Sequence, residues 1–258
     1  MLRKNFEIII GLTTFNHEFL KLSISGLVGA HKNVLLVIYN DNPCKKLSKK
    51  YVRRLGYRGN LIIINTDENS GTLRARIALI EHIKKNKLIS NWFMFANDDD
   101  VVLNTTVPSV SDNTFAIMGN SVVVASGLIN VMRIMDNSQD FTIDGVDNML
   151  VAPHIGMSGT LVRMDTMIQY ADFMTEIIDK IHVITDNTPF APPIDLIMWN
   201  ILVEYMRKTH PNMSPIYMNQ NNYLMTKLNG TRRATDVQAQ SMIERVMSVA
   251  NAALRGNE

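Results

Sequence analysis

The apolar segment Trp92-Phe93-Met94-Phe95-Ala96 runs directly into Asn97-Asp98-Asp99-Asp100. A short apolar run that ends in a polar cluster is typical of a strand buried on both faces. Three consecutive carboxylates repel one another, and placing them at the end of a buried strand is costly unless a cation compensates their charge. The segment therefore predicts a buried strand that delivers an acidic turn to a binding edge.

The residues before this segment repeat the alternation of short apolar runs with longer amphipathic stretches. Strands are predicted at residues 6–11, 34–39, 61–64 and 92–96, and helices at residues 16–29, 45–55 and 70–85. This alternation is typical of parallel strands joined by right-handed helical crossovers. The sequence therefore predicts the α/β class, with an open, mostly parallel sheet flanked by helices and a Rossmann-like N-terminal half.

The pattern loosens after the acidic turn. Strands are predicted at residues 121–126, 131–135 and 159–163, helices at residues 165–181, 194–206 and 235–254, and a polar insertion at residues 136–147. No internal repeat divides the chain, and its 258 residues suit one elaborated domain. We expect a single domain over residues 1–258 with a mixed sheet.

Composition excludes several classes of protein. With 46% hydrophobic and 19% charged residues, the chain is too apolar for a disordered tail, and its net charge of +2 demands no polyanionic partner. Cys44 is the single cysteine, which excludes an internal disulfide framework and a cysteine zinc cluster. We find no signal peptide and no apolar stretch of about 18 residues, so we expect a cytoplasmic protein without a transmembrane segment.

Polar clusters follow four of the predicted strands, and a parallel sheet brings such clusters to one rim, where ligands bind. They are Thr13-Thr14-Phe15-Asn16, Asn40-Asp41-Asn42-Pro43, Asn65-Thr66-Asp67-Glu68-Asn69 and Asn97-Asp98-Asp99-Asp100. Hard oxygen ligands favour Mg²⁺ or Mn²⁺, held by one or two carboxylates together with substrate phosphates. We expect Asp98 and Asp100 to share the ion while Asp99 turns toward sugar or backbone. The alternatives are a solvated acidic turn and a helix N-cap.

These clusters resemble the motifs of nucleotide-sugar-dependent glycosyltransferases with the GT-A fold, particularly the large inverting family 2. Residues 6–16 resemble the opening strand and its T-x-N turn, and Asn97-Asp98-Asp99-Asp100 resembles the DXD-type metal motif. Asn69-Ser70-Gly71-Thr72-Leu73-Arg74-Ala75-Arg76 is similar to the N-x-G-x-x-x-A-R segment. The resemblance covers residues 6–102 in the family's order and spacing.

The resemblance implies that residues 1–102 bind a nucleoside-diphosphate sugar, with a UDP-sugar favoured, and that Mn²⁺ or Mg²⁺ is the cofactor. The donor-binding residues would be Thr13, Thr14, Asn16, Asp41, Asn69, Gly71, Arg74, Arg76, Asp98 and Asp99. Asp41 would contact the nucleotide base. Arg74 or Arg76 would add a charge-assisted bond to phosphate, or else both would lie on a solvated helix face.

Residues 103–258 carry a thinner resemblance, to the acceptor-binding half with its C-terminal helix. His154, Gly156 and Ser158 lie in a segment that looks like the glycine-rich acceptor-side strand. Asp195 stands where the family usually shows an acidic pair, and it is our candidate for the base that deprotonates the acceptor hydroxyl in an inverting displacement. As alternatives, Asp195 is a helix N-cap, Asp186 replaces it, or the enzyme retains configuration and needs no such base.

A later metal ligand is also expected from the C-terminal third, where His210 and Asp236 are the candidates. The basic run from residue 45 to 58 contains no acidic residue: Lys45, Lys46, Lys49, Lys50, Arg53, Arg54 and Arg58. Such a face is usually solvated, but it also suits peripheral contact with an anionic surface. The acceptor therefore stays open between a glycan, a lipid-linked acceptor and nucleic acid.

Two other functions compete with this interpretation. A sugar-phosphate nucleotidyltransferase needs a glycine-rich basic loop after the first strand, and Leu12-Thr13-Thr14-Phe15-Asn16 has neither glycine nor base. A non-catalytic nucleic-acid-binding protein would use the basic run. A steep salt dependence of DNA binding without nucleotide-sugar hydrolysis would favour the latter.

Overall fold

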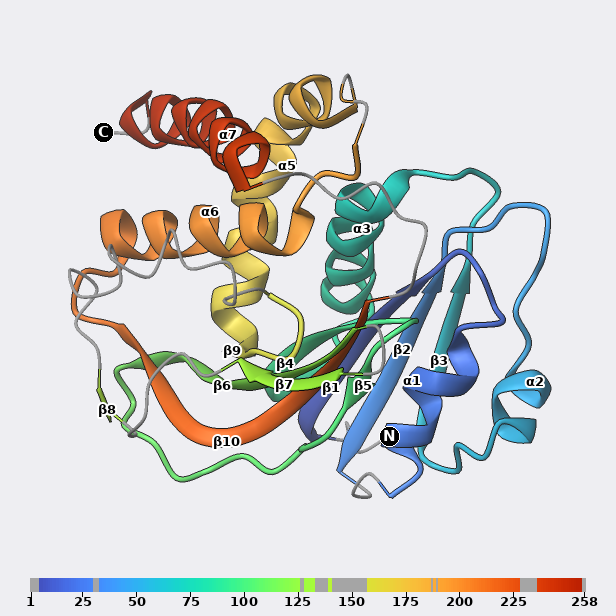
Figure 1. Ribbon diagram of the computed structural model, residues 1–258. Coiled ribbons are helices and arrows are strands. Elements are labelled where there is room, and N and C mark those ends of the chain that lie inside the picture. The colour runs from blue at the N-terminus through green and yellow to red at the C-terminus, as the bar shows by residue number, and fades with distance from the viewer. Residues whose placement is uncertain are drawn as a thin grey trace.

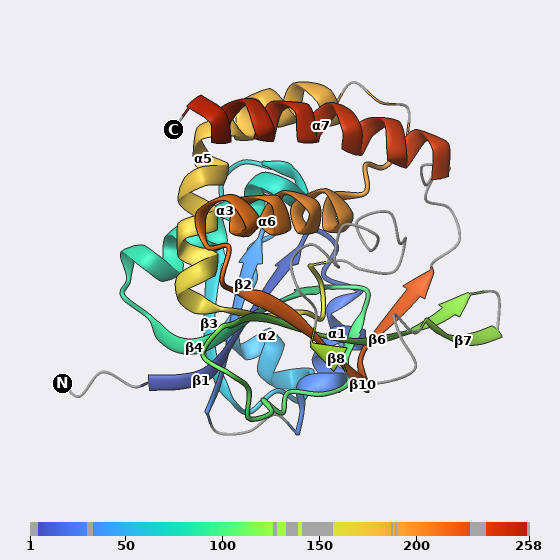
Figure 2. The same cartoon turned by 90° about the vertical axis from the view of Figure 1, so that its left-hand side faces the viewer.

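One sheet runs through both halves of the chain in the computed structural model (Figure 1). The structure describes residues 5–29, 33–125, 128–132, 139–140, 157–186, 188, 190–227 and 236–256. Figure 2 shows the same layers from the side, with the helices of the second half lying above the sheet.

The first half of the sheet is parallel and contains the crossovers predicted from the sequence. Its strands are β1 (Asn5–Thr14), β2 (Val34–Asn40), β3 (Asn60–Asn65) and β4 (Ile89–Asn97). They are connected in turn by α1 (Leu20–Leu27), α2 (Lys49–Arg54) and α3 (Gly71–Lys85). The hydrogen-bonded order is β3-β2-β1-β4. Every residue of β2 is buried, which explains its unbroken apolar run.

The second half adds a mixed extension beyond β4. Its strands are β5 (Val101–Val102), β6 (Thr114–Ala125), β7 (Leu128–Met132), β8 (Gln139–Asp140), β9 (Leu161–Arg163) and β10 (Ser214–Lys227). The short strand β9 joins the halves because it pairs antiparallel with both β4 and β6, and β10 runs parallel to β6. The helices are α5 (Met164–Asp186), α6 (Ile194–Thr209) and α7 (Asp236–Gly256).

Helices cover the two faces of the parallel half with different cores. Alternate residues of β1 divide between them: Ile9 packs in the core that includes α3, α5, α6 and α7, whereas Ile8 and Ile10 pack in the core that includes α1 and α2. Gly11 allows the close approach of the neighbouring strand, since a Cβ there would lie 2.6 Å from a ring carbon of Phe93. This packing fixes the strand ends relative to α3.

The predicted α/β class with an open, mixed sheet is confirmed. The main error is β10, which the sequence analysis does not predict, and β6 begins at Thr114 rather than at residue 121. Most of the expected insertion at residues 136–147 lies outside the described residues. None of the described helices is both long and apolar enough to span a bilayer.

Candidate active site at the carboxyl ends of the parallel strands

The four polar clusters meet at one rim, as predicted. Thr13 pairs in register with Tyr39 on one side and with Asn97 on the other, and Asn40 pairs with Asn65. Side chains reinforce this rim: the Asn40 Nδ2 group donates to Asn65 Oδ1 at 2.8 Å, and His17 Nε2 lies 2.8 Å from Asn40 Oδ1. The loops after the strands are therefore held together by hydrogen bonds.

A cavity of about 380 Å³ opens at this rim. It is lined by six of the predicted donor-binding residues, and the full lining is Thr13, Thr14, Phe15, Asn16, Phe19, Asp41, Thr72, Ala75, Asn97, Asp98 and Asp99. Phe15 is 52% exposed at its mouth, so the cavity presents an aromatic ring beside polar groups. Polar groups that converge on a concave site with an apolar wall suit a small ligand.

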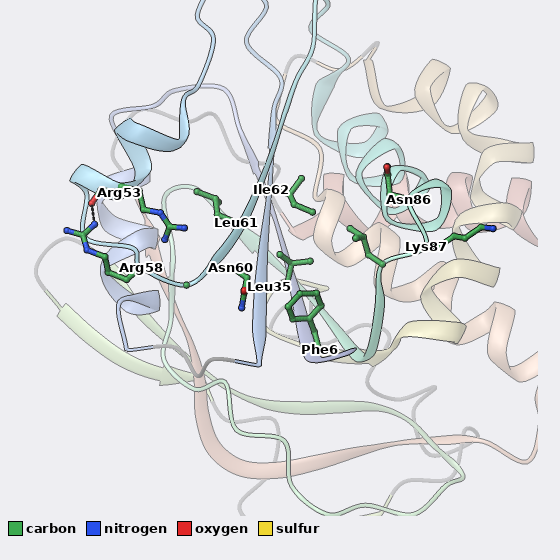
Figure 3. A pocket seen from close by; sticks show the side chains of 11 residues that line it. Phe6, Leu35, Arg53, Arg58, Asn60, Leu61, Ile62, Asn86 and Lys87 are labelled. Carbon is green, nitrogen blue, oxygen red and sulfur yellow. Dashed lines mark hydrogen bonds between the residues drawn. The ribbon is translucent and has the colours of Figure 1, made fainter. Parts of the chain in front are cut away.

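A larger cavity, of about 870 Å³, lies at the opposite ends of the strands. Figure 3 shows Phe6 and Leu35 near the starts of β1 and β2, with Arg53 and Arg58 on one side and Lys87 on the other. Its lining includes Arg53 and Arg58 of the basic run but none of the described residues predicted to bind donor, acceptor or metal or to act as the base. We therefore place the candidate active site in the smaller cavity, beside the acidic turn.

The acidic turn has an uncompensated charge at Asp98. Thr14 Oγ1 donates to Asp98 Oδ2 at 2.6 Å, and no Lys or Arg among the described residues pairs with Asp98. Burial raises the pKa of Asp98 to about 6, and the neighbouring charge of Asp99 adds to the rise, whereas hydrogen bonds from Thr14 and the backbone limit it. A carboxylate in this state favours an added cation.

The arrangement of the three aspartates differs from the expectation. Asp98 and Asp99 line the cavity, whereas Asp100 is buried and accepts a hydrogen bond from Asn97 Nδ2 at 2.9 Å. Among the described residues, no group of three or more His, Cys, Asp or Glu side chains is close enough to form a complete metal site. One or two carboxylates that face a ligand cavity nevertheless fit Mg²⁺ or Mn²⁺, which keep waters and substrate phosphates as their other ligands.

Asp41 lines the cavity but is engaged with the first turn of α3. It accepts hydrogen bonds from Ser70 N at 2.9 Å, Ser70 Oγ at 2.8 Å and Gly71 N at 2.9 Å. Asn69 Oδ1 also accepts from Gly71 N, at 3.1 Å. Gly71 has a φ of 76°, a left-handed conformation that favours glycine. Asp41, Asn69 and Gly71 therefore build the turn that opens α3.

The two arginines of α3 have different surroundings, and neither lines the cavity. Arg74 forms a surface ion pair with Asp179 of α5, with 2.8 Å between Nη2 and Oδ1. Arg76 is 1% exposed and directs its guanidinium at three partners: Nη1 donates to Asp195 at 2.8 Å, and Nη2 donates to Asn97 Oδ1 at 2.7 Å and Ser158 Oγ at 2.9 Å. Both guanidinium groups are thus engaged by side chains of the protein, and a phosphate contact of Arg74 or Arg76 stays a prediction.

Asp195 lies across Arg76 from the acidic turn. Its Oδ1 accepts from Arg76, from Ser158 N at 3.1 Å and from Ser158 Oγ at 2.7 Å, while no described residue donates to Oδ2. Desolvation alone would raise the pKa of Asp195, but the charge of Arg76 and the hydrogen bonds from Arg76 and Ser158 outweigh it and hold the pKa below its usual value. The side chain of Asp195 is 31% exposed.

Several other predicted residues lie elsewhere. His210 follows the last turn of α6, roughly 20 Å from Asp195 at the other end of that helix, and its part as a metal ligand stays a prediction. Asp186 pairs with His182 in the last turn of α5, at 2.7 Å, and is not beside Ser158. Asp236 is the first residue of α7. His154 and Gly156 lie outside the described residues.

Sequence reasoning missed Tyr223 of β10. Its phenol oxygen accepts a hydrogen bond from the Asn97 backbone N–H at 2.8 Å, which supports the start of the acidic turn. Burial raises the pKa of Tyr223 well above its usual value, with the charge of Asp100 adding to the rise. Gly159 makes room for this ring, because a Cβ there would lie 2.6 Å from the Cβ of Tyr223.

Comparisons with known proteins give a fold and no family. No family model matches the chain, and no curated protein matches it. The full S. aureus TarS chain superposes with a TM-score of 0.61 at 12% identity, over 96% of this chain and 39% of that one.

Residues 1–349 of S. aureus TarS in complex with UDP superpose with a TM-score of 0.59 at 11% identity, over 96% of this chain and 65% of that one. The same fragment in a second structure gives 0.56 at 10% identity. The present chain therefore spans about two-fifths of full TarS, and at these identities the likeness establishes the shared fold.

Proposed function

We propose that the chain is a metal-dependent glycosyltransferase of the hexosyltransferase type, which moves a sugar from a UDP-sugar to a hydroxyl acceptor with inversion. The observation that carries the proposal is a single cavity at the carboxyl ends of the parallel strands, with Asp98 and Asp99 in its wall and Asp195 held nearby through Arg76. The UDP bound to the similarly folded S. aureus TarS supports the choice of donor.

In this proposal, Asp98 and Asp99 are the residues that would hold Mn²⁺ or Mg²⁺. When bound, the ion stabilises the negative charge that develops on the leaving diphosphate. Thr13, Thr14 and Asn16 line the same cavity and offer hydroxyl and amide groups to the donor. Because Asp41 is occupied by the first turn of α3, its part is to shape the donor cavity, with base contact left to the groups around it.

Asp195 takes the proton of the acceptor hydroxyl at Oδ2. As the acceptor oxygen bonds to the anomeric carbon, the bond from that carbon to the phosphate oxygen breaks, and UDP leaves with the electron pair. The low pKa keeps Asp195 ionised at neutral pH, so the base is ready before the acceptor arrives. Asp195 lies in the first turn of α6, where the helix dipole also favours the ionised carboxylate.

Calorimetry tests this function. UDP-sugars and GDP-sugars are titrated into the protein with Mn²⁺ and with EDTA. We expect UDP-sugar binding that requires Mn²⁺, and at least a tenfold loss of affinity in Asp98→Asn, on the order of 1.4 kcal/mol. Asp172→Asn is the matched control, because Asp172 is a surface aspartate of α5 that pairs with Lys84. Equal binding with and without metal would remove the proposal.

A further inference from the structure

We infer that Arg76 is a positioning residue, which joins the donor-side acidic turn to the acceptor-side base Asp195 and sets the orientation of that base. The inference rests on the proposed function and deepens it, because it assigns to an arginine of α3 a part in proton transfer rather than in phosphate binding. It starts from the unusual burial of the side chain, which is 1% exposed.

The guanidinium connects three separate elements. Nη1 reaches Asp195 in the first turn of α6, while Nη2 reaches Asn97 at the end of β4 and Ser158 before β9. Asn97 is the residue before Asp98, so one planar group fixes the distance between the acidic turn and the base. A guanidinium suits this task because its donors are fixed in one plane, unlike those of an ammonium group.

The surroundings of Arg76 keep this geometry rigid. The ring of Phe95 lies 5.0 Å from the guanidinium carbon, and Met198 Sδ lies 3.6 Å from Nη1. A buried ion pair gains little stability over a well-packed apolar pair, so stability alone does not explain an arginine here. Among the described residues, the hydrogen bonds to the Asp195 carboxylate all end on Oδ1, so Arg76 and Ser158 together fix the position of that oxygen.

Among the described residues, the charged and titratable groups that interact with Asp195 are Arg76 and Tyr223. Arg76 of α3 is the cation, and Tyr223 of β10 stays neutral because its pKa is raised well above the usual value. Removing the charge of Arg76 therefore leaves desolvation as the main influence on Asp195. Its protonation midpoint should then rise by about one pH unit or more.

The experiment compares Arg76→Gln, Arg76→Lys and Ser158→Ala with the wild type. Lys84→Gln is the matched control, since Lys84 also belongs to α3 and pairs with an aspartate of α5, but at the surface. The midpoint of Asp195 is read from the ¹³Cγ resonance in metal-free protein labelled at aspartate, and Asp195→Asn assigns the resonance. This measurement needs no activity, so its failure is separable from failure of the proposed function.

We expect the midpoint to rise in Arg76→Gln, to rise less in Arg76→Lys and Ser158→Ala, and to stay unchanged in Lys84→Gln. With Mn²⁺ and UDP-sugar, kcat for donor hydrolysis should fall about tenfold or more in Arg76→Gln, whereas UDP affinity changes less than threefold. An unmoved midpoint, or an equal loss of UDP affinity and kcat, would overturn the inference. Ser158→Ala keeps the test valid if Arg76→Gln does not fold.

Discussion

Asp98 is the residue at which the site lowers the stability of the metal-free fold. Its carboxyl is desolvated beside Asp99, its pKa is raised to about 6, and no described cation compensates it. The folded protein therefore binds a proton at Asp98 more tightly than the unfolded chain does. Ionised Asp98 destabilises the metal-free fold above pH 6, and this penalty disappears as the pH falls toward the unfolded value near 4.

Asp98→Asn should accordingly stabilise the metal-free protein at pH 7.5 by about 1–3 kcal/mol, with the loss of the Thr14 bond reducing the gain. At pH 4.5 the stabilisation should be much smaller. Urea unfolding in EDTA at both pH values measures it. The same change in unfolding free energy at the two pH values would show that the carboxyl is not desolvated.

Proton competition should also govern metal binding at Asp98. The affinity for Mn²⁺ should be constant above about pH 7 and should fall as the pH drops below 6, because the proton and the ion compete for the same carboxylate. Titration calorimetry with Mn²⁺ at pH 5.0, 6.0 and 7.5 measures this. An affinity that is independent of pH over this range would place the ion elsewhere.

At the scale of the element, α3 connects the cavity, through Thr72 and Ala75, to Asp195, through Arg76. Asp41 accepts hydrogen bonds at the first turn of α3. The buried face of the helix contains Leu73, Arg76, Ile80 and Ile83, which recur at helical spacing. Two residues apart on a helix point in different directions, which is why Arg74 reaches the surface while Arg76 is buried. The spacing of the apolar residues in the sequence could therefore have predicted that Arg76 is buried and that Arg74 is at the surface.

Asp41→Ala should lower stability by about 1–2 kcal/mol, because it removes the acceptor of Ser70 N–H and leaves Gly71 N–H with Asn69 Oδ1 alone. It should also weaken UDP binding, since the first turn of α3 borders the cavity. Ser48→Ala is a control of the same kind: Ser48 caps α2 by accepting from Tyr51 N, away from the cavity. We expect Ser48→Ala to lower the melting temperature and leave UDP affinity unchanged.

Some strands could be predicted from their own sequence, and others could not. The parallel strands were predictable because burial on both faces leaves continuous apolar runs such as residues 34–39 of β2. Strand β10 was not, since Asn219-Gln220-Asn221-Asn222 in its centre is typical of a loop. Its pairing with β6, irregular around Asn221, is a tertiary constraint that no local pattern contains.

The candidate site was also predictable only where the local sequence or the strand topology determines it. The strand-end clusters were predictable from topology, because parallel strands bring them to one rim. The partners of Arg76 were not, since its contacts with Asn97 and Asp195 join residues 21 and 119 positions away in the chain. The contact of Tyr223 with Asn97 was not predictable for the same reason.

At the scale of the whole molecule, the net charge of +2 does not show that basic residues are clustered between residues 45 and 58. The basic run is partly engaged: Lys46 pairs with Asp67, and Arg53 and Arg58 bond to backbone carbonyls. Lys49 and Lys50 open α2, and Arg54 ends it. Contact of this face with an anionic surface, and the cytoplasmic location, stay predictions from the sequence.

Vesicles with anionic headgroups should bind the protein at 50 mM salt and release it at 500 mM, where charge screening is short-ranged. Lys49→Glu combined with Lys50→Glu and Arg54→Glu should abolish this binding and leave UDP affinity unchanged. Binding that persists at high salt, or in the triple variant, would contradict an electrostatic contact. Tighter binding to single-stranded DNA than to vesicles would point to a nucleic-acid acceptor.

The most direct measurement is the anomalous diffraction of Mn²⁺ in crystals grown with UDP. We expect one Mn²⁺ peak within about 2.3 Å of carboxylate oxygens of Asp98 or Asp99, next to the UDP diphosphate in the cavity beside Thr13 and Thr14. UDP bound in that cavity without the ion, or Mn²⁺ bound away from the acidic turn, would contradict it.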